Sequence, residues 1–344
     1  MKKVLVTGAS GFVGSHLITR LAQNGFATRA VYRNLPKDTV NSTDTLPSTG
    51  KGFVEAFLLP DVSKKADLDR AVEGVNTIVH LAGLAHSKPT IKRLEESEHT
   101  RINTEHTKYW AEAAIKADVK RFIYLSTIKV LGEFTPEGKT FNELSVPFPR
   151  DSYSQSKLKA EEAIKKFCKN KNTEYVILRP PLIYGPGAKG NMSNLVNYVN
   201  KRLILFVPTV KNKRSIISIS NLSDAITSCI EHPAAANETF MVSDGRDVST
   251  GELIQLISEA LGGIKVAVPV SKFALFFVGF VGDLYYHVTG KRNNVDSEAI
   301  FKLQSSLRID VSKIQGQLGW VASETLKSGV SSMVTKDKLD HCSS

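Results

Sequence analysis

Two residues that could move a proton, Tyr153 and Lys157, stand four apart near the start of a predicted helix over residues 152–170. Residues four apart share one helix face, so the phenol and the ammonium are expected side by side. A free tyrosine has a pKa near ~10, and a neighbouring ammonium lowers that pKa by favouring the phenolate. By itself such a pair is also common on a solvated helix surface. Ser126 and Thr127, at the end of a predicted strand, add hydroxyl groups that could bind and orient a substrate alcohol.

A glycine-rich turn near the start of the chain could hold phosphates. Gly8, Gly11 and Gly14 are spaced GxxGxxG between a short apolar run and a helical pattern. Such glycines permit a tight turn, a close approach to a pyrophosphate and close packing of helix on strand, while the helix N-terminus offers free N–H groups. The sequence therefore predicts a dinucleotide site whose loop also contains Ser10, Phe12 and Val13.

The end of the second predicted strand bears on which dinucleotide binds. Arg33 stands there, and no acidic residue occurs before position 38. An acid at this place usually binds the ribose hydroxyls of NAD, whereas a cation accommodates a 2′-phosphate. Arg33, helped by Arg29 or Lys37, therefore favours NADP(H), with NAD(H) as the alternative if Arg33 is a solvated surface residue. Asp61 and Val62, after another strand, could hold the adenine, although Asp61 could equally form a turn.

Strand-like and helical segments alternate around these residues. Apolar runs of strand length, separated by helical stretches, occur at residues 4–6, 28–32, 53–58, 77–81, 121–126 and 175–179. This order predicts an α/β, Rossmann-type doubly wound parallel sheet. We expect an NAD(P)-binding domain over 1–180 and a smaller C-terminal substrate-binding lobe over 181–344, with segments near 215–219 and 239–242 able to return to the first domain.

Composition excludes several other classes of protein. The chain has 344 residues and a formal net charge of +11, and its three cysteines lie far apart. A disulfide framework and a zinc ribbon are therefore excluded, and we expect no metal. The apolar stretch 273–288 meets Asp283 too early for a membrane span, so it predicts a core helix or a partly exposed apolar surface. We expect a cytoplasmic protein.

Several motifs together carry a resemblance to a known family. The three loop glycines, Thr127, the segment from Tyr153 to Lys157 and the segment 179–187 resemble the extended short-chain dehydrogenase/reductase family, in its NAD(P)-dependent nucleotide-sugar epimerase/dehydratase branch. The string 125–133 resembles the UDP-glucose 4-epimerase-like subgroup, and 310–313 and 318–320 resemble the family's closing signature. The likeness runs from residue 1 to about 335.

The resemblance implies roles for particular residues. Tyr153 would move the proton of a sugar hydroxyl, Lys157 would lower the tyrosine pKa and hold the nicotinamide ribose, and Thr127 would bind the reacting oxygen. Further cofactor contacts are implied for Leu81, Ala82, Gly83, Asn103 and Pro180. Substrate contacts are implied for Asn191, Arg214 and, more loosely, Arg292 or Arg308.

The resemblance leaves two reactions at sugar C4 open. Dehydrating relatives place Asp-Glu after the threonine, whereas this chain has Ile128 and Lys129, so dehydration is not expected. A UDP-hexose or UDP-N-acetylhexosamine 4-epimerase and a UDP-4-keto-6-deoxy-sugar 4-reductase remain, for the synthesis of surface polysaccharide precursors. The alternative is a catalytically inactive NADP-sensing or RNA-binding scaffold of the same fold. The sequence has no basic run interleaved with aromatic residues, so no nucleic-acid partner is expected. The resemblance implies a homodimer.

Overall fold

The computed structural model describes residues 2–35, 45–46, 52–85, 92–262, 265–289 and 296–342. Its main sheet has the strand order β11-β7-β6-β5-β1-β2-β4-β3, and every neighbouring pair is parallel except β3 with β4. The strands are β1 (Lys3–Thr7), β2 (Ala27–Tyr32), β3 (Thr45–Leu46), β4 (Val54–Leu58), β5 (Thr77–His80), β6 (Arg121–Leu125), β7 (Glu174–Arg179) and β11 (Glu238–Met241). This is the Rossmann-type α/β sheet predicted from the sequence, which is thereby confirmed.

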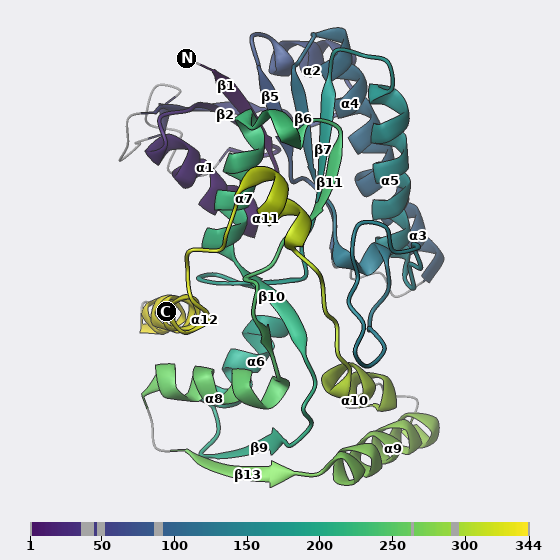
Figure 1. Ribbon diagram of the computed structural model, residues 1–344, viewed down its shortest axis with the longest axis vertical. Coiled ribbons are helices and arrows are strands. Elements are labelled where there is room, and N and C mark those ends of the chain that lie inside the picture. Colours follow the sequence, from purple (N-terminus) through teal and green to yellow (C-terminus); the bar gives the residue numbers. More distant parts are fainter. Residues whose placement is uncertain are drawn as a thin grey trace.

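Helices cover both faces of this sheet (Figure 1). Successive strand side chains point to opposite faces, so Val4 and Val6 join one buried cluster and Leu5 joins the other. One face is covered by α1 (Phe12–Gln23) and α7 (Ile219–Glu231), and the other by α2 (Lys65–Val72), α4 (His106–Lys116) and α5 (Ser152–Cys168). Because both faces are covered, the central strands are mostly apolar rather than alternating.

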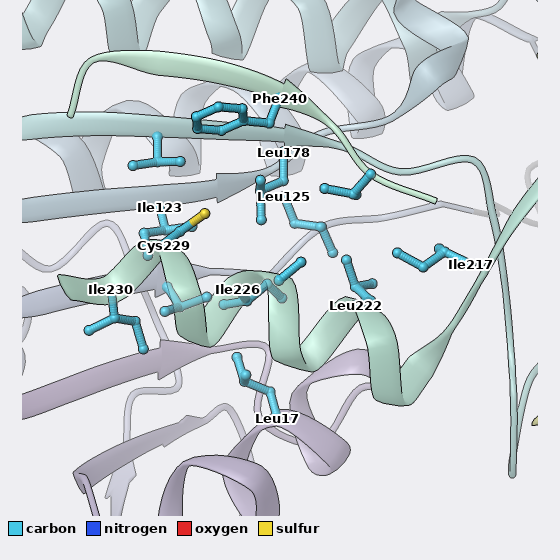
Figure 2. Close-up of a cluster of buried hydrophobic side chains, with 14 of the residues drawn as sticks. Leu17, Ile123, Leu125, Leu178, Ile217, Leu222, Ile226, Cys229, Ile230 and Phe240 are labelled. Atoms are coloured by element: carbon cyan, nitrogen blue, oxygen red, sulfur yellow. The ribbon is translucent and has the colours of Figure 1, made fainter. Parts of the chain in front are cut away.

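The helix α7 shows how the first of these clusters is packed. Leu222, Ile226 and Cys229 of α7 lie against Ile123 and Leu178 of the sheet (Figure 2). All five side chains are almost fully buried. The helix belongs to the second half of the chain but packs on the first domain, so the two parts of the sequence share one core.

The remaining strands form two small sheets. The sheet β12-β10-β8 contains β8 (Leu182–Tyr184), β10 (Arg214–Ser218) and β12 (Asp247–Val248), and the second pairs β9 (Ile204–Pro208) with β13 (Val266–Val270). Of the two segments that could return to the main sheet, 239–242 lies largely in β11 beside β7, whereas 215–219 lies mostly in β10 and pairs with β8 and β12. Only the segment 239–242 therefore returns to the Rossmann-type sheet, through its pairing with β7.

The other helices complete the chain. They are α3 (Lys92–His99), α6 (Asn191–Asn200), α8 (Thr250–Leu261), α9 (Lys272–Thr289), α10 (Ser297–Gln304), α11 (Ser312–Leu318) and α12 (Leu326–Cys342), with the single turns η2 (Thr100–Glu105), η3 (Ile128–Val130) and η4 (Pro233–Ala235). Among the described residues, no helix is both long enough and apolar enough to cross a membrane.

Candidate active site

The strand order reverses between β1 and β5, and a buried hydrogen-bond network joins the ends of these strands. The Thr7 hydroxyl accepts the backbone N–H groups of Leu81 and Ala82, each at 3.1 Å, and lies 2.8 Å from His80 Nδ1. His80 Nε2 lies 3.0 Å from the Thr107 hydroxyl. Burial lowers the pKa of His80 to about 3, so its ring is neutral. The network therefore lies where the strand order reverses, which is the place where open α/β sheets bind ligands.

The glycine loop follows β1 at that point. A Cβ atom on Gly14 would lie 2.2 Å from the Gly8 carbonyl oxygen, and one on Gly8, whose φ is +69°, would lie 2.8 Å from the Ala82 nitrogen. Helix α1 begins directly after Gly11, with no side-chain cap and no acidic residue in its first turn. Its first N–H groups therefore remain free for an anionic ligand. Ser10 is exposed and Phe12 and Val13 are half-buried.

The residues predicted for the adenosine end lie beyond β2 and β4. Arg33 is exposed, and within the described part of the chain it makes no ion pair or side-chain hydrogen bond. Arg29 is not available to assist it, because its guanidinium pairs with Glu55 and donates to the carbonyl of Ala71 at 2.6 Å. Lys37 and Arg292 lie outside the described residues.

Asp61 has a local role in addition to any contact with a ligand. Its carboxylate accepts the backbone N–H of Ser63 at 2.9 Å and the Ser63 hydroxyl at 2.7 Å, and both bonds lower its pKa. This is the turn that the sequence predicts as the alternative to an adenine contact. Burial of its ring is the main cause that lowers the pKa of His106, and the positive charges of Arg101 and Arg33 lower it further. Both arginines therefore lie near His106. Val62 is half-buried against the core.

Tyr153 lies at the N-terminus of α5, where a capping box fixes the backbone. The Asp151 carboxylate accepts the Ser154 backbone N–H at 2.7 Å, and the Ser154 hydroxyl accepts the Asp151 N–H at 3.2 Å. Burial and the Asp151 carboxylate raise the pKa of Tyr153 to about 12, while a hydrogen bond with the Thr127 hydroxyl opposes the rise. Thr127 and Tyr153 are therefore brought together, as the sequence predicts.

Lys157 is one turn further along α5 and almost fully buried. Its ammonium donates to the Leu125 carbonyl at 2.9 Å and lies 4.7 Å from the centre of the Tyr124 ring. Burial lowers its pKa to about 8, against the Glu161 charge. In this structure the ammonium is bound to a carbonyl and the Tyr153 pKa is raised, so the lowering of that pKa by Lys157 stays a prediction. Gly83 leaves room for the ammonium, because a Cβ there would lie 3.2 Å from Lys157 Nζ.

Ser126, which is predicted to bind substrate, has a protein partner in this structure. Its hydroxyl donates to Glu161, which also forms a bidentate pair with Arg179 through bonds of 3.0 and 2.5 Å. Ser126 is 4% exposed, and both members of the ion pair are also buried. The hydroxyl is therefore part of a buried network that joins β6, β7 and α5. Pro180, next to Arg179, is buried, and its carbonyl accepts the Ile128 N–H at 2.9 Å.

Asn103 lies in η2, a π-helical turn between α3 and α4. Its amide accepts the Leu84 N–H at 2.7 Å and donates to the Leu84 carbonyl and to the Ser156 hydroxyl. The residue is fully buried, and its side chain positions the loop after β5 at Leu84; its contact with a cofactor stays a prediction. Sequence patterns at a 3.6-residue period give no signal for a π turn, although such turns are frequent at functional sites.

His99 lies beside Tyr153 and is not among the predicted site residues. Its ring meets the Tyr153 ring edge-on at 6.0 Å, and its Nδ1 lies 2.8 Å from the Ser152 hydroxyl. Its Nε2 is buried and has no hydrogen-bond partner in the described structure. A lone histidine on a polar helix carries no sequence signal for this position.

The predicted substrate residues lie in the second lobe. Asn191 is exposed at the first position of α6. The Arg214 guanidinium donates to the carbonyls of Lys302 and Ser305 at 2.7 and 3.1 Å, and burial lowers its pKa. Arg308 pairs with Asp247 at 2.7 Å. Neighbouring backbone and carboxylate groups therefore orient both arginines, while the remaining guanidinium N–H groups of Arg214 are without a protein partner among the described residues.

A groove of about 590 Å³ lies beside these arginines, between the loop that follows β9, helix α8 and strand β13. Lys211, Lys213, Asp247 and Glu252 are among its lining residues. Thr127, Tyr153 and Lys157 do not line it. The walls of this groove come from segments far apart along the chain, so no sequence pattern predicts it.

These residues fit a bound nicotinamide dinucleotide. The uncapped N-terminus of α1 suits a pyrophosphate, and Arg33, without an ion-pair partner in the described structure, suits a further phosphate. Lys157 and Tyr153 lie beyond the loop after β5. The nicotinamide ring of a dinucleotide bound at the ends of the strands would lie near them.

Comparison with known proteins places this architecture among its relatives. Residues 4–243 match the model of the NAD dependent epimerase/dehydratase family. The chain is 35% identical over 331 residues to the UDP-glucose 4-epimerase of Vibrio cholerae, covering 95% of this chain and 93% of that protein. It is 26% identical over 333 residues to the N-acetyl-alpha-D-glucosaminyl-diphospho-ditrans,octacis-undecaprenol 4-epimerase of Escherichia coli O157:H7, covering 95% and 92%. The solved structure of MoeE5 with UDP-glucuronic acid and NAD has a TM-score of 0.73 at 22% identity, covering 98% and 99% of the two chains.

Proposed function

The chain belongs to the NAD dependent epimerase/dehydratase family, and on that premise we propose that it transfers a hydride at C4 of a UDP-linked hexose. The observation that carries the proposal is the grouping of Thr127, Tyr153 and Lys157 at the ends of β6 and α5, beside the glycine loop. An alcohol that loses or gains a hydride must also lose or gain a proton, and Tyr153 is the group placed to move it.

The chain's own residues divide this work. The Thr127 hydroxyl binds the reacting oxygen together with the Tyr153 phenol, and the phenol takes or returns the proton. Lys157 holds the nicotinamide ribose and offers a positive charge beside the phenol once its ammonium leaves the Leu125 carbonyl. Bound NAD(P) supplies or accepts the hydride. Arg214 binds the sugar diphosphate through its free N–H groups, and Asn191 binds the sugar-nucleotide beside it.

The first candidate reaction is 4-epimerisation. Two relatives that match almost the whole chain are 4-epimerases by name, one for UDP-glucose and one for a sugar carried on diphospho-undecaprenol. Both names describe a sugar joined to a diphosphate, the group that Arg214 is proposed to bind. We propose the UDP-linked sugar as substrate and would test the lipid-linked sugar beside it.

The second candidate is reduction of a UDP-4-keto-6-deoxy sugar, and Arg33 favours it. Among the described residues, this exposed arginine pairs with no acid, so it is free to bind the 2′-phosphate of NADPH. A reductase must exchange its cofactor in every cycle and draws on the NADPH pool, whereas an epimerase retains one cofactor.

One pair of assays separates the two reactions. The enzyme is incubated with a UDP-4-keto-6-deoxy-N-acetylhexosamine and NADPH, and separately with UDP-glucose and UDP-N-acetylglucosamine without added cofactor. Stoichiometric loss of NADPH absorbance supports reduction. Interconversion of the UDP-hexoses with no net NADPH oxidation supports epimerisation. Absence of both activities would contradict the proposal that C4 is the reacting carbon.

The cofactor preference has its own test. Replacing Arg33 by alanine should weaken NADPH binding by about tenfold, roughly the loss of one charge-assisted hydrogen bond, and should leave NADH binding unchanged. Calorimetry with both cofactors measures the two dissociation constants. Arg20, which pairs with Asp224, gives a control substitution on α1. Equal losses for NADPH and NADH, or tighter binding of NAD by the unchanged protein, would contradict a 2′-phosphate contact.

The family default implies a homodimer formed by α4 and α5. We propose this arrangement for the chain, and light scattering of the purified protein measures it. A monomer that is fully active would contradict the proposal.

A further inference from the structure

Helix α9 turns a wide apolar face outward. Phe273, Phe276, Phe277 and Phe280 are 85%, 67%, 65% and 54% exposed. The other large exposed apolar residues of this helix are Val278, Val281, Leu284 and Tyr285. Contiguous apolar exposure of this kind marks a binding surface, because single exposed apolar residues do not gather on one element by chance.

The inner face of α9 explains why the phenylalanines point outward. The side toward α10 is a narrow stripe formed by Leu275, Gly279 and Gly282. A Cβ on Gly279 would lie 3.1 Å from Ser297 Cα and 3.2 Å from Ile300 Cγ1, so the two helices pack closely at a small residue. The stripe leaves no room for the large side chains, which occupy the rest of the helix surface.

The sheet β9–β13 carries a second apolar face at the same end of the molecule (Figure 1). Ile204 and Phe206 of β9 pair with Val266 and Val268 of β13, and side chains of paired residues share one side of a sheet. Ile204, Phe206 and Val266 are each more than half exposed, and Leu203, just before β9, is 76% exposed. Strand β13 leads into α9 through Ser271 alone, so both faces belong to one continuous stretch of structure.

Charge distinguishes this end of the molecule. Segments 201–211 and 265–282 contain five basic residues and no acidic residue. The basic residues are Lys201, Arg202, Lys211, Lys265 and Lys272. All are exposed except Lys265, which is half-buried and whose ammonium donates to the Arg202 carbonyl at 2.9 Å. The first acid after them, Asp283, is turned toward α10, where its carboxylate accepts the Ser297 N–H at 3.1 Å. The exposed acid of α10, Glu298, is paired with Lys302.

We propose that α9 and the outer face of β9–β13 dock the protein on the surface of an anionic lipid bilayer. Apolar side chains would enter the boundary between headgroups and acyl chains, and the flanking lysines and arginine would meet the anionic headgroups. A second copy of the chain is the less favourable occupant, because pairing two such ends would oppose five cations to five cations. This docking is independent of the reaction proposed above.

The helix lies on the bilayer and does not cross it. Among the described residues no helix is long and apolar enough to span. An interfacial helix instead needs an apolar face and adjacent basic residues, and both are present in α9 and the strand before it.

Vesicle sedimentation tests the docking. The full-length protein is mixed with vesicles of phosphatidylcholine alone and with vesicles that contain phosphatidylglycerol, and the bound fraction is measured. We expect binding to the anionic vesicles and a loss of at least tenfold in affinity for the double substitution Phe276→Ser and Phe277→Ser. The matched control is Val321→Ser, an apolar residue 65% exposed in the loop after α11, which should bind as the unchanged protein does.

The electrostatic part is tested separately. Replacing Lys201 and Lys272 by glutamine should weaken binding by about tenfold or more, at about 1 kcal/mol per cation, and added salt should weaken it likewise. Glutamine at Lys169 and Lys171, exposed after α5, is the control. Failure of the unchanged protein to bind anionic vesicles, or equal binding to both kinds of vesicle, would overturn the proposal. A dimer that dissociates on the Phe276 and Phe277 substitutions, with no vesicle binding, would identify a second copy as the occupant.

Discussion

Replacing Lys157 by methionine removes an ammonium that the fold buries at a cost in stability. Lys157 is 5% exposed, and burial lowers its pKa from 10.5 to about 8, with the Glu161 carboxylate acting in the opposite direction. The folded protein therefore binds this proton more weakly than the unfolded chain does. The free energy of unfolding is reduced in full at pH values below the folded pKa, and the reduction disappears as the pH rises toward the unfolded pKa.

The two pKa values give the magnitude. One pKa unit corresponds to about 1.4 kcal/mol, so the full cost of burying the ammonium is about 3 kcal/mol. Nearly all of this loss of unfolding free energy is present at about pH 7, and the loss is smaller by about 1 kcal/mol at about pH 9. Because the methionine variant has no group to titrate, the unchanged protein should gain about 1 kcal/mol relative to the Lys157→Met variant across this range.

Urea denaturation followed by circular dichroism measures both free energies of unfolding at a series of pH values. Lys159→Met is the matched control, since Lys159 is exposed on the same helix and its removal takes no charge out of the interior. Its stability relative to the unchanged protein should stay constant with pH. A Lys157→Met difference that is flat, or that moves in the opposite direction, would refute the conclusion that the fold holds a desolvated ammonium at the Leu125 carbonyl.

Two further substitutions test the loop and the phenol. Gly14→Ala places a methyl group 2.2 Å from the Gly8 carbonyl oxygen and should abolish NAD(P) binding in calorimetry. The control is Gly316→Ala, in a helix with nothing within 4 Å, which should stabilise the protein by about 1 kcal/mol. Unchanged cofactor binding by the Gly14 variant would contradict the close packing. Asp151→Asn keeps the helix cap, at a cost of a few tenths of a kcal/mol, but removes the charge that raises the pKa of Tyr153. The pH profile of kcat/KM should then move to lower pH, and a profile that does not move would show that this carboxylate does not act on the phenol.

The sequence predicted the fold well because its signals are local. Apolar runs of strand length alternate with helical periodicity, and the glycine loop falls between the first strand and helix, so the Rossmann-type sheet and the family are both confirmed. The position of β10 was harder to predict. An apolar run such as 215–219 has the same pattern in either sheet, and only its tertiary partners β8 and β12 decide where it pairs.

The candidate site was less predictable, because side-chain partners come from distant segments. The types of Tyr153 and Lys157 indicated their chemistry, but not that the ammonium binds the Leu125 carbonyl and leaves the phenol with a raised pKa. Ser126 looked like a substrate ligand from its place at the end of a strand, and Glu161, which is 35 residues away, takes its hydroxyl. The outward face of α9 was one of two expectations for the stretch 273–288, since periodicity does not show which side of a helix meets its neighbour.

We propose above that Tyr153 moves the proton while hydride is exchanged at sugar C4. The most direct test is kcat for the Tyr153→Phe variant, which removes a single oxygen, measured in whichever of the two assays the unchanged enzyme passes. We predict a fall of at least about 100-fold, the usual contribution of a positioned acid or base, with the dissociation constant for NAD(P) changed by less than about threefold. Full activity in this variant would contradict the claim.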